Sequence, residues 1–171
     1  MSIQSLRLPK LVESDPRGTV LRQSLIEHAQ PIRAGSEISV AVAQFDGLES
    51  ALQSAHRAGR VVRGLETAER SLATEERGLR LVNHSSGVKR GDRVSRLLLL
   101  TDDGSDGFYR QVENLLRRHG PRVLAIRLNV DAAGLGAPLF GAGRTTRLLL
   151  IQHKEAVVAV LLGVAKQFGS M

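Results

Sequence analysis

The chain has 171 residues, no cysteine and a formal net charge of +7, because 24 Lys and Arg outnumber 17 Asp and Glu. This length fits one domain with a sizeable core, or a domain of about 120 residues with an extension, and it disfavours two full domains. The lack of cysteine excludes a disulfide framework and thiolate chemistry. The positive charge comes nearly all from arginine and favours a polyanionic partner.

Composition also disfavours two other classes of protein. Aromatic residues make up only 3% of the chain and Trp is absent. An aromatic platform for splayed bases is therefore not expected, and arginine and backbone groups would have to carry any contact with nucleic acid. The start of the chain, MSIQSLRLPK, lacks the apolar core of a signal peptide, and no apolar run is long enough to span a membrane. We expect a cytoplasmic protein without a membrane partner.

The first 46 residues match no unit that we can assign. Thr19 is a plausible N-cap for a helix over residues 19–30, and Pro31 would stop that helix. Residues 38–45, ISVAVAQF, read as a strand or an extended linker. We treat residues 1–46 as an N-terminal extension that either packs on the main domain or forms a mobile arm.

Residues 47–72 read as a helix, a two-glycine turn and the start of a second helix. The first helix has one apolar face, and Gly59 would end it in the left-handed conformation. The turn itself is basic, with Arg57, Arg60 and Arg63 before the second helix begins near Leu65. The N-terminus of that helix, with these arginines and Arg70, would suit an anion such as a phosphate. The alternative is that the arginines only solvate an amphipathic surface.

The second half of the chain alternates strands and helices. Residues 79–82 and 94–101 form two β-rich runs separated by a polar loop or hairpin, and the second run suits a central strand covered on both faces. A helix over residues 108–119 and a strand over 122–128 follow, so the two flanking strands should be parallel. The remaining expected elements are a glycine-rich connection over 132–143, a strand over 146–151 and a helix over 154–168.

These elements predict an α/β fold for residues 47–171. The strands form a mostly parallel central sheet, and the helices cover both of its faces. The architecture is therefore a three-layer α/β/α sandwich with an N-terminal extension.

Several short motifs occur in an order that is typical of one family. Residues 54–64 contain the pattern A-x-x-A-G-x-x-x-x-G, which begins at Ala55 and ends at Gly64. The basic Arg70 follows six residues later. A strand then runs into acidic residues at 97–103, and a turn that begins at Leu135 and Gly136 leads through Arg144 to the strand at 148–151. In this order the chain resembles, over residues 47–168, the kink-turn-binding ribosomal protein family, or L-seven-A-e group, and especially its small bacterial relatives.

The resemblance implies a non-enzymatic RNA-binding or ribosome-associated protein of translation, with structured RNA or a ribonucleoprotein as partner. Gly64 and the amides after it would approach RNA phosphates, and Arg63 and Arg70 would supply charge. The further phosphate contacts that it implies are Arg60, Lys89 and Arg144. The loop over residues 129–136 would flank the bases. Residues 64–70 lack the Asn-Glu pair of the signature G-x-N-E-x-x-K, so kink-turn recognition itself is left open.

An acidic loop offers a different function. Asp102, Asp103 and Asp106 follow a central strand, where α/β proteins place ligands, and spaced carboxylates there could hold Mg²⁺. The alternative, which we favour, is that these residues form turns and cap a helix. The second reading of the chain is therefore a small α/β protein that binds a metal, a nucleotide or a protein partner at residues 102–106.

No catalytic residue, cofactor or metal ligand is predicted. The five histidines show no metal-ligand spacing, and the glycines of residues 134–143 lack the Gly-Lys-Ser/Thr ending of a phosphate loop. No nucleophile-elbow serine is present. A third reading gives the N-terminal arm and the Leu/Val-rich C-terminal helix a role in forming a homo-oligomer.

Overall fold

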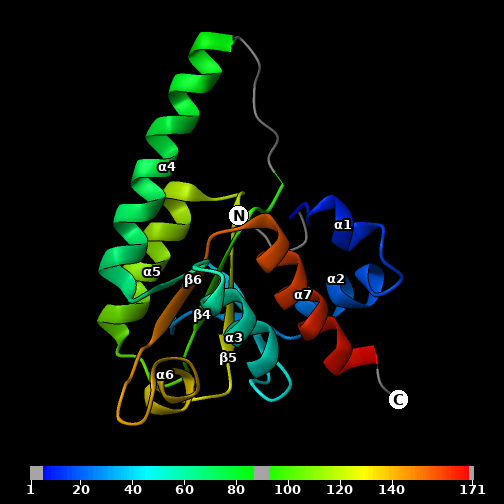
Figure 1. Ribbon diagram of the computed structural model, residues 1–171, viewed down its shortest axis with the longest axis vertical. Coiled ribbons are helices and arrows are strands. Elements are labelled where there is room, and N and C mark those ends of the chain that lie inside the picture. The colour runs from blue at the N-terminus through cyan, green and yellow to red at the C-terminus, as the bar shows by residue number, and fades with distance from the viewer. Residues whose placement is uncertain (1–5, 87–92, 170–171) are drawn as a thin grey trace.

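A six-stranded mixed sheet forms the centre of the protein in the computed structural model, which describes residues 6–86 and 93–169 (Figure 1). The strand order is β1-β2-β5-β4-β6-β3. The strands are β1 (Ala29–Pro31), β2 (Ser39–Ala43), β3 (Val61–Arg63), β4 (Arg96–Leu100), β5 (Val123–Leu128) and β6 (Leu148–Ile151). Strands β2, β5 and β4 are parallel, whereas β1, β6 and β3 each run antiparallel to their neighbours. The predicted α/β class with a parallel sheet centre is confirmed.

Helices cover both faces of this sheet. The seven described helices are α1 (Lys10–Glu13), α2 (Gly18–Glu27), α3 (Glu49–Arg57), α4 (Leu65–Ser86), α5 (Asp106–His119), α6 (Ala132–Phe140) and α7 (Lys154–Gly169). Leu97 and Leu99 of β4 pack with residues of α2, α3, α6 and α7, whereas Leu98 and Leu100 pack with residues of α4 and α5. Successive strand residues point to opposite faces, so the leucine run of β4 serves two cores at once. The three-layer sandwich is therefore confirmed.

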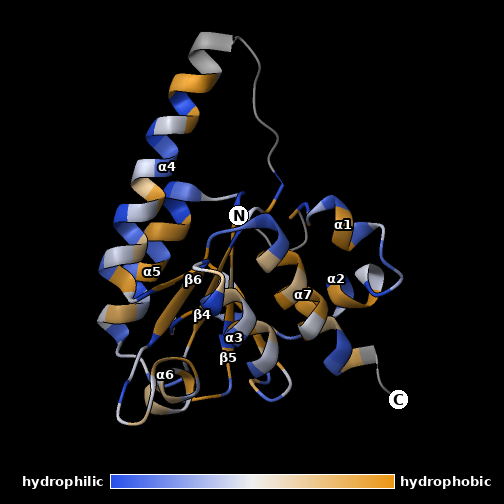
Figure 2. Ribbon diagram, viewed as in Figure 1, coloured by the Kyte–Doolittle hydropathy of each residue, from blue (hydrophilic) through white to orange (hydrophobic). Residues whose placement is uncertain are grey.

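The hydropathy pattern explains why the central strands are buried. Figure 2 shows the strands as the most hydrophobic part of the molecule and polar residues along the outer helices. All four residues of β6 and four of the five residues of β4 are buried. Such continuous apolar runs suit strands that are covered on both faces. None of the helices that the structure describes is long and apolar enough to cross a membrane.

Residues of the segment 6–45 contribute to the same sheet and core. Strand β2 pairs in parallel with β5, with Ala41 opposite Ile126. Leu21 and Leu25 of α2 are buried in the core cluster that also contains Leu97 and Leu99. Helix α2 begins at Gly18 and not at Thr19. Position 18 needs a glycine because a Cβ there would lie 2.2 Å from the Val12 carbonyl oxygen.

Two predicted segments have a different structure. Residues 79–82, predicted as a strand, belong to the 22-residue helix α4, whose far half extends beyond the sheet in Figure 1 and leaves Leu81 68% exposed. Residues 132–140, predicted as part of a glycine-rich connection, form α6. The Asp131 side chain caps this helix by accepting a hydrogen bond of 2.7 Å from the Gly134 N–H.

Helix α6 also explains why β6 is antiparallel to β4. The helix has nine residues and lies near the edge of the sheet where β5 ends (Figure 1). It therefore does not carry the chain back to the opposite edge, and β6 starts beside the end of β4, with Leu148 opposite Leu100. We call this edge, where the parallel strands β2, β4 and β5 end, the carboxyl edge.

Candidate nucleic-acid interface

The predicted residues Arg63, Gly64 and Arg144 lie close together at the carboxyl edge. Arg63 ends β3 and pairs with Leu149, and the Gly64 N–H donates a 3.0 Å hydrogen bond to the Leu148 carbonyl. The loop over residues 141–147 leads into β6 at the same place and contains Arg144. We call Arg57, Arg63, Gly64, Phe140 and Arg144 the Arg63 surface.

The Arg63 side chain is held from two sides. Its Nη2 donates a 2.7 Å hydrogen bond to the Thr145 carbonyl oxygen, and its guanidinium carbon lies 4.9 Å from the centre of the Phe140 ring. The position of the guanidinium carbon over the ring adds a cation–π attraction to the hydrogen bond. Arg63 nevertheless stays exposed to solvent. The structure thus fixes a guanidinium group at the surface, and no acidic residue among those described pairs with it.

Phe140 is itself fixed by α3. The His56 ring meets it edge-on, with ring centres 4.9 Å apart and an angle of 77° between the planes. The Gln53 side chain donates a 3.2 Å hydrogen bond to the Pro138 carbonyl, which ties the end of α6 to α3. His56 is followed directly by Arg57, which is exposed at the end of α3. Three elements therefore support the Arg63 side chain.

The loop that carries Arg144 packs tightly on α6. A Cβ on Gly136 would lie 2.4 Å from the Arg144 carbonyl oxygen and 2.7 Å from the Thr145 Cα, so only glycine fits there. Arg144 is exposed, and its side chain has no hydrogen bond or ion pair within residues 6–86 and 93–169. The same holds for Arg57 within these ranges. Arg144 is therefore an uncompensated cation in the loop that holds the Arg63 side chain.

Gly64 precedes α4 with a φ of +92°, a conformation that favours glycine. Its carbonyl accepts the 3.1 Å hydrogen bond from the Ala68 N–H that begins the helix. A Cβ at Gly64 would meet nothing within 4 Å, so its surroundings are open. The first N–H groups of an α-helix have no acceptor inside the helix, and they attract anions. The first N–H groups of α4 therefore lie next to the Arg63 surface, and the first turn of the helix also carries the acidic Glu66.

The structure does not bring the other predicted residues to this surface. Arg60 lies at the opposite end of β3, where it forms a 3.2 Å ion pair with Glu155 of α7. Arg70 is exposed on α4, and because Ala68 and Leu72 turn toward the sheet, Arg70 lies on the outer face of that helix. Lys89 lies outside the described residues.

Sequence reasoning missed Phe140, Thr145 and His56 as parts of the site. Phe140 and Thr145 lie in or just after the stretch that was expected to be a plain connection. The bond from Arg63 to Thr145 joins residues 82 positions apart, so no local pattern could reveal it.

The acidic loop contacts residues of α6 and of the loop before β6. The Ala132 N–H donates to Asp103 at 3.2 Å, and Arg147 lies 3.8 Å from the same carboxylate. Partial burial acts to raise the pKa of Asp103, but the Thr101 hydroxyl, the Ala132 N–H and Arg147 outweigh it, and the pKa lies below its ordinary value. Ser105 caps α5 by accepting from the Phe108 N–H. Among the residues described, no group of three His, Cys, Asp or Glu could hold a metal ion.

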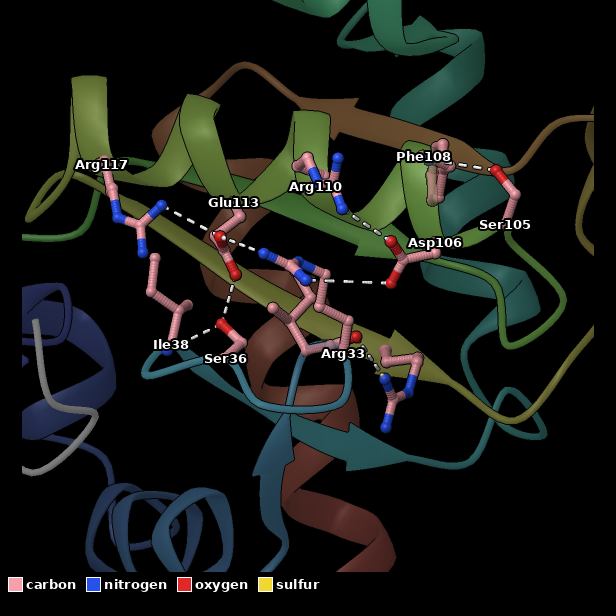
Figure 3. Close-up of polar contacts among 11 residues, drawn as sticks. Arg33, Ser36, Ile38, Ser105, Asp106, Phe108, Arg110, Glu113 and Arg117 are labelled. Atoms are coloured by element: carbon pink, nitrogen blue, oxygen red, sulfur yellow. Dashed lines mark hydrogen bonds and ion pairs between the residues drawn. The ribbon is translucent and has the colours of Figure 1, made fainter.

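A second polar cluster lies between α5 and the turn after β1 (Figure 3). The Glu113 side chain is only 3% exposed, and it accepts hydrogen bonds from Ser36, from Arg117 at 3.0 Å and from Arg33 at 3.4 Å. The Ser36 hydroxyl most of all, and then the two arginines, hold the pKa of Glu113 below its ordinary value despite its burial. Asp106 pairs with Arg110 at 3.2 Å and lies 3.9 Å from Arg33.

A third cluster joins α4 to the opposite edge of the sheet. Arg96, at the start of β4, binds both oxygens of Glu75 at 2.8 and 2.9 Å. Arg122 contacts Glu76 at 3.2 Å and Glu75 at 3.4 Å, and the buried His119 lies 3.6 Å from Glu76. These five residues, which we call the α4 anchor, hold the middle of α4 against the body of the protein.

Comparison with known proteins does not assign the chain to a family. No family model and no curated protein matches the chain. Among solved structures, the chain is similar to a protein with unknown function from Bacillus halodurans C, with 17% sequence identity and a TM-score of 0.44. The match covers 70% of this chain and 96% of that one.

Proposed function

We propose that this protein is a non-enzymatic RNA-binding module of a ribonucleoprotein or of translation, and that the Arg63 surface is its contact with structured RNA. The observation that carries the proposal is that Arg63 and Arg144 lie exposed at the carboxyl edge, and Arg57 at the end of the helix that supports Phe140, without an acidic partner in the described residues. The net charge of +7 would attract a polyanion from a distance. The order of motifs shared with the L-seven-A-e group supports the same partner.

The chemistry of the surface suits phosphate groups. Arg57 and Arg144 are exposed and can turn to meet phosphates, whereas the fixed Arg63 offers its remaining N–H donors at a set position. The open backbone at Gly64 lets a phosphate approach the first N–H groups of α4. Arg60 and Arg70 would then act at the margin, through their charge.

The test is binding of the purified protein to a kink-turn RNA and to a duplex of the same length across a salt series. We expect salt-sensitive binding and a preference for the structured RNA. The double variant Arg57→Ala/Arg144→Ala should lower the slope of log affinity against log salt by about 1.5, because each phosphate contact contributes about 0.7 to 0.9.

The matched control removes two exposed arginines elsewhere. Arg80→Ala/Arg118→Ala changes the net charge equally, and neither residue belongs to the Arg63 surface. This variant should keep a slope close to that of the parent protein. Loss of the same amount of slope in both double variants, or no binding to either RNA at low salt, would contradict the proposal.

A further inference from the structure

We propose that the outer edge of β3 binds an extended acidic segment of a partner protein, which adds a further strand to the sheet. The inference goes beyond the proposed contact with RNA and does not depend on it. It rests on the direction in which the backbone groups of β3 point and on the charges beside them.

Two residues of β3 direct their backbone groups away from the sheet. The Arg60 carbonyl accepts a 2.9 Å hydrogen bond and the Gly64 N–H donates one of 3.0 Å, both across to the segment of β6. Alternate positions of an antiparallel ladder bond the neighbouring strand. Val62 therefore bonds β6, whereas the N–H and carbonyl groups of Val61 and Arg63 point outward. Among the described residues, no strand lies beyond β3 in the sheet.

The opposite edge of the sheet, β1, is closed by its sequence. The His28 carbonyl and the Ile32 N–H bond the segment of β2, so by the same alternation Pro31 faces outward. Proline has no N–H and protects an edge against a further strand. Strand β3 contains no proline, and its β-branched Val61 and Val62 favour an extended conformation. The sheet therefore has one closed edge and one open edge.

The charges beside the open edge favour an acidic partner. Val61 packs against the core cluster on the α3 side of the sheet, and Arg63, two residues later, has its side chain on the same face. The exposed Arg144 lies in the loop whose Thr145 carbonyl holds Arg63. No acidic residue among those described pairs with Arg63. An acidic side chain opposite Arg63 would supply the missing cross-strand partner.

The same charges disfavour a second copy of this chain as the added strand. If two β3 strands paired antiparallel about Val62, Arg63 of each copy would lie opposite Val61 of the other. The two Arg63 residues would then be diagonal neighbours on one face, about 7 to 8 Å apart. Their repulsion opposes this pairing, whereas an acidic strand meets the opposite charge.

The geometry also predicts the order of side chains in the partner. In an antiparallel pair, the partner residue opposite Arg63 comes first, and the residue opposite Val61 comes two positions later. The first should be acidic. The second should be apolar, as should the residue between them, because Val61 and Val62 are partly buried against the two core clusters. The expected pattern is therefore an acid followed by two apolar residues.

The test is an NMR titration of the isotope-labelled full chain with a blocked peptide, Thr-Glu-Val-Val-Thr, up to millimolar concentration. We expect saturable shifts of the signals of residues 61–63. Hydrogen exchange of the Val61 and Arg63 N–H groups should slow on binding, because both gain acceptors. Exchange of the Val62 N–H should change less, since β6 already bonds it. Absence of binding, or binding without protection of Val61 and Arg63, would overturn the inference.

Two N-methylated peptides separate strand pairing from attraction by charge. A methyl group on the glutamate nitrogen removes a donor that points to the Arg63 carbonyl, and should weaken binding about tenfold. A methyl group on the nitrogen of the first valine, which points away from β3, should leave the affinity unchanged. Equal affinity of the two methylated peptides would exclude strand addition.

Charge reversal tests the choice of an acidic partner. Arg63→Glu should bind the glutamate peptide about threefold more weakly and should prefer Thr-Lys-Val-Val-Thr, because the cross-strand charge pair is reversed. Arg118→Glu, at an exposed position of α5, is the matched control and should behave like the parent protein. A thermal melt shows that each variant is folded. If Arg63→Glu kept the parent's preference for the glutamate peptide, the acidic partner would be wrong. All of these measurements are made without RNA, so their failure leaves the proposed RNA contact in place.

Discussion

The arginines of this protein fall into two groups that have the same chemistry and different surroundings. Arg33, Arg96 and Arg122 each contact a glutamate and are between 12% and 25% exposed. Arg57, Arg63 and Arg144 are exposed, and the side-chain contacts described for them are with a carbonyl oxygen and an aromatic ring at Arg63. The first group joins elements of the fold, and the second is available for a partner.

The difference teaches that a count of arginines does not locate a binding surface. An arginine paired with a glutamate adds little to the field that a polyanion feels, because the two charges largely cancel at a distance. Its removal would chiefly affect stability, since it leaves a partly buried carboxylate without its partner. An exposed arginine without an acid contributes fully to that field, and its removal should change the stability little. The two groups can therefore be separated by measuring stability and RNA affinity on the same variants.

The largest loss of stability is expected for Glu113→Ala. Glu113 is almost fully buried and its removal leaves Arg33 without its closest acidic partner. We expect the free energy of unfolding to fall by about 3 kcal/mol. Urea unfolding measures the change, and RNA affinity of the folded variant should match that of the parent protein.

The control for this variant is Arg110→Ala on the same helix. Its ion pair with Asp106 is exposed, with both side chains 60% accessible, and should contribute less than about 0.5 kcal/mol. If Glu113→Ala cost no more than Arg110→Ala, the arginines around Glu113 would not have the structural role given to them here.

Gly136→Ala should affect stability and binding together. The added Cβ would meet the backbone of Arg144 and Thr145, which belongs to the loop that holds the Arg63 side chain. We expect a loss of about 2 kcal/mol from this overpacking, and weaker RNA binding because the loop must move. Both effects can be measured by urea unfolding and by the salt series.

The matched substitution is Gly78→Ala on the exposed side of α4, where an added Cβ meets nothing within 4 Å. It should raise the free energy of unfolding by about 0.5 to 1 kcal/mol through helix propensity and leave RNA binding unchanged. A neutral result for Gly136→Ala on both measurements would show that the contact between α6 and the loop does not position the Arg63 surface.

The central elements were predictable because their signals are local. The run of four leucines in β4 and the apolar residues of β5 and β6 indicate buried strands without any knowledge of their neighbours. The helices α5 and α7 have an apolar face or a long apolar content that fixes their type. These signals were enough to predict the three-layer architecture and the parallel pairing of β4 with β5.

The errors arose where a distant contact outweighs a local pattern. Leu79, Leu81 and Val82 resemble a short strand, but they continue a helix whose preceding turns are held by Arg96 and Arg122. Gly134 and Gly136 suggest a loop, although Gly136 is needed because α6 packs against the backbone of residues 144 and 145. The candidate site shows the same limit. Arg63, Gly64 and Arg144 were named from motifs, but the ring and the carbonyl that hold Arg63 come from segments that only the fold brings near.

The smallest expected effect concerns His119 in the α4 anchor. Burial holds the pKa of His119 below its ordinary value of 6.5, with Arg122 and Arg118 acting in the same direction and Glu76 opposing them. The unfolded chain therefore binds a proton more readily than the folded protein. The contribution of neutral His119 to the free energy of unfolding should be fully present above about pH 6.5. It should decline as the pH falls below that value, by less than about 1.4 kcal/mol per pH unit.

His119→Gln should flatten this decline in urea unfolding between pH 5 and 7.5, whereas His153→Gln, at an exposed position before α7, should retain it. An identical pH dependence in His119→Gln and the parent protein would mean that the α4 anchor does not sense this proton, and the acid sensitivity of the fold would then have to come from its carboxylates.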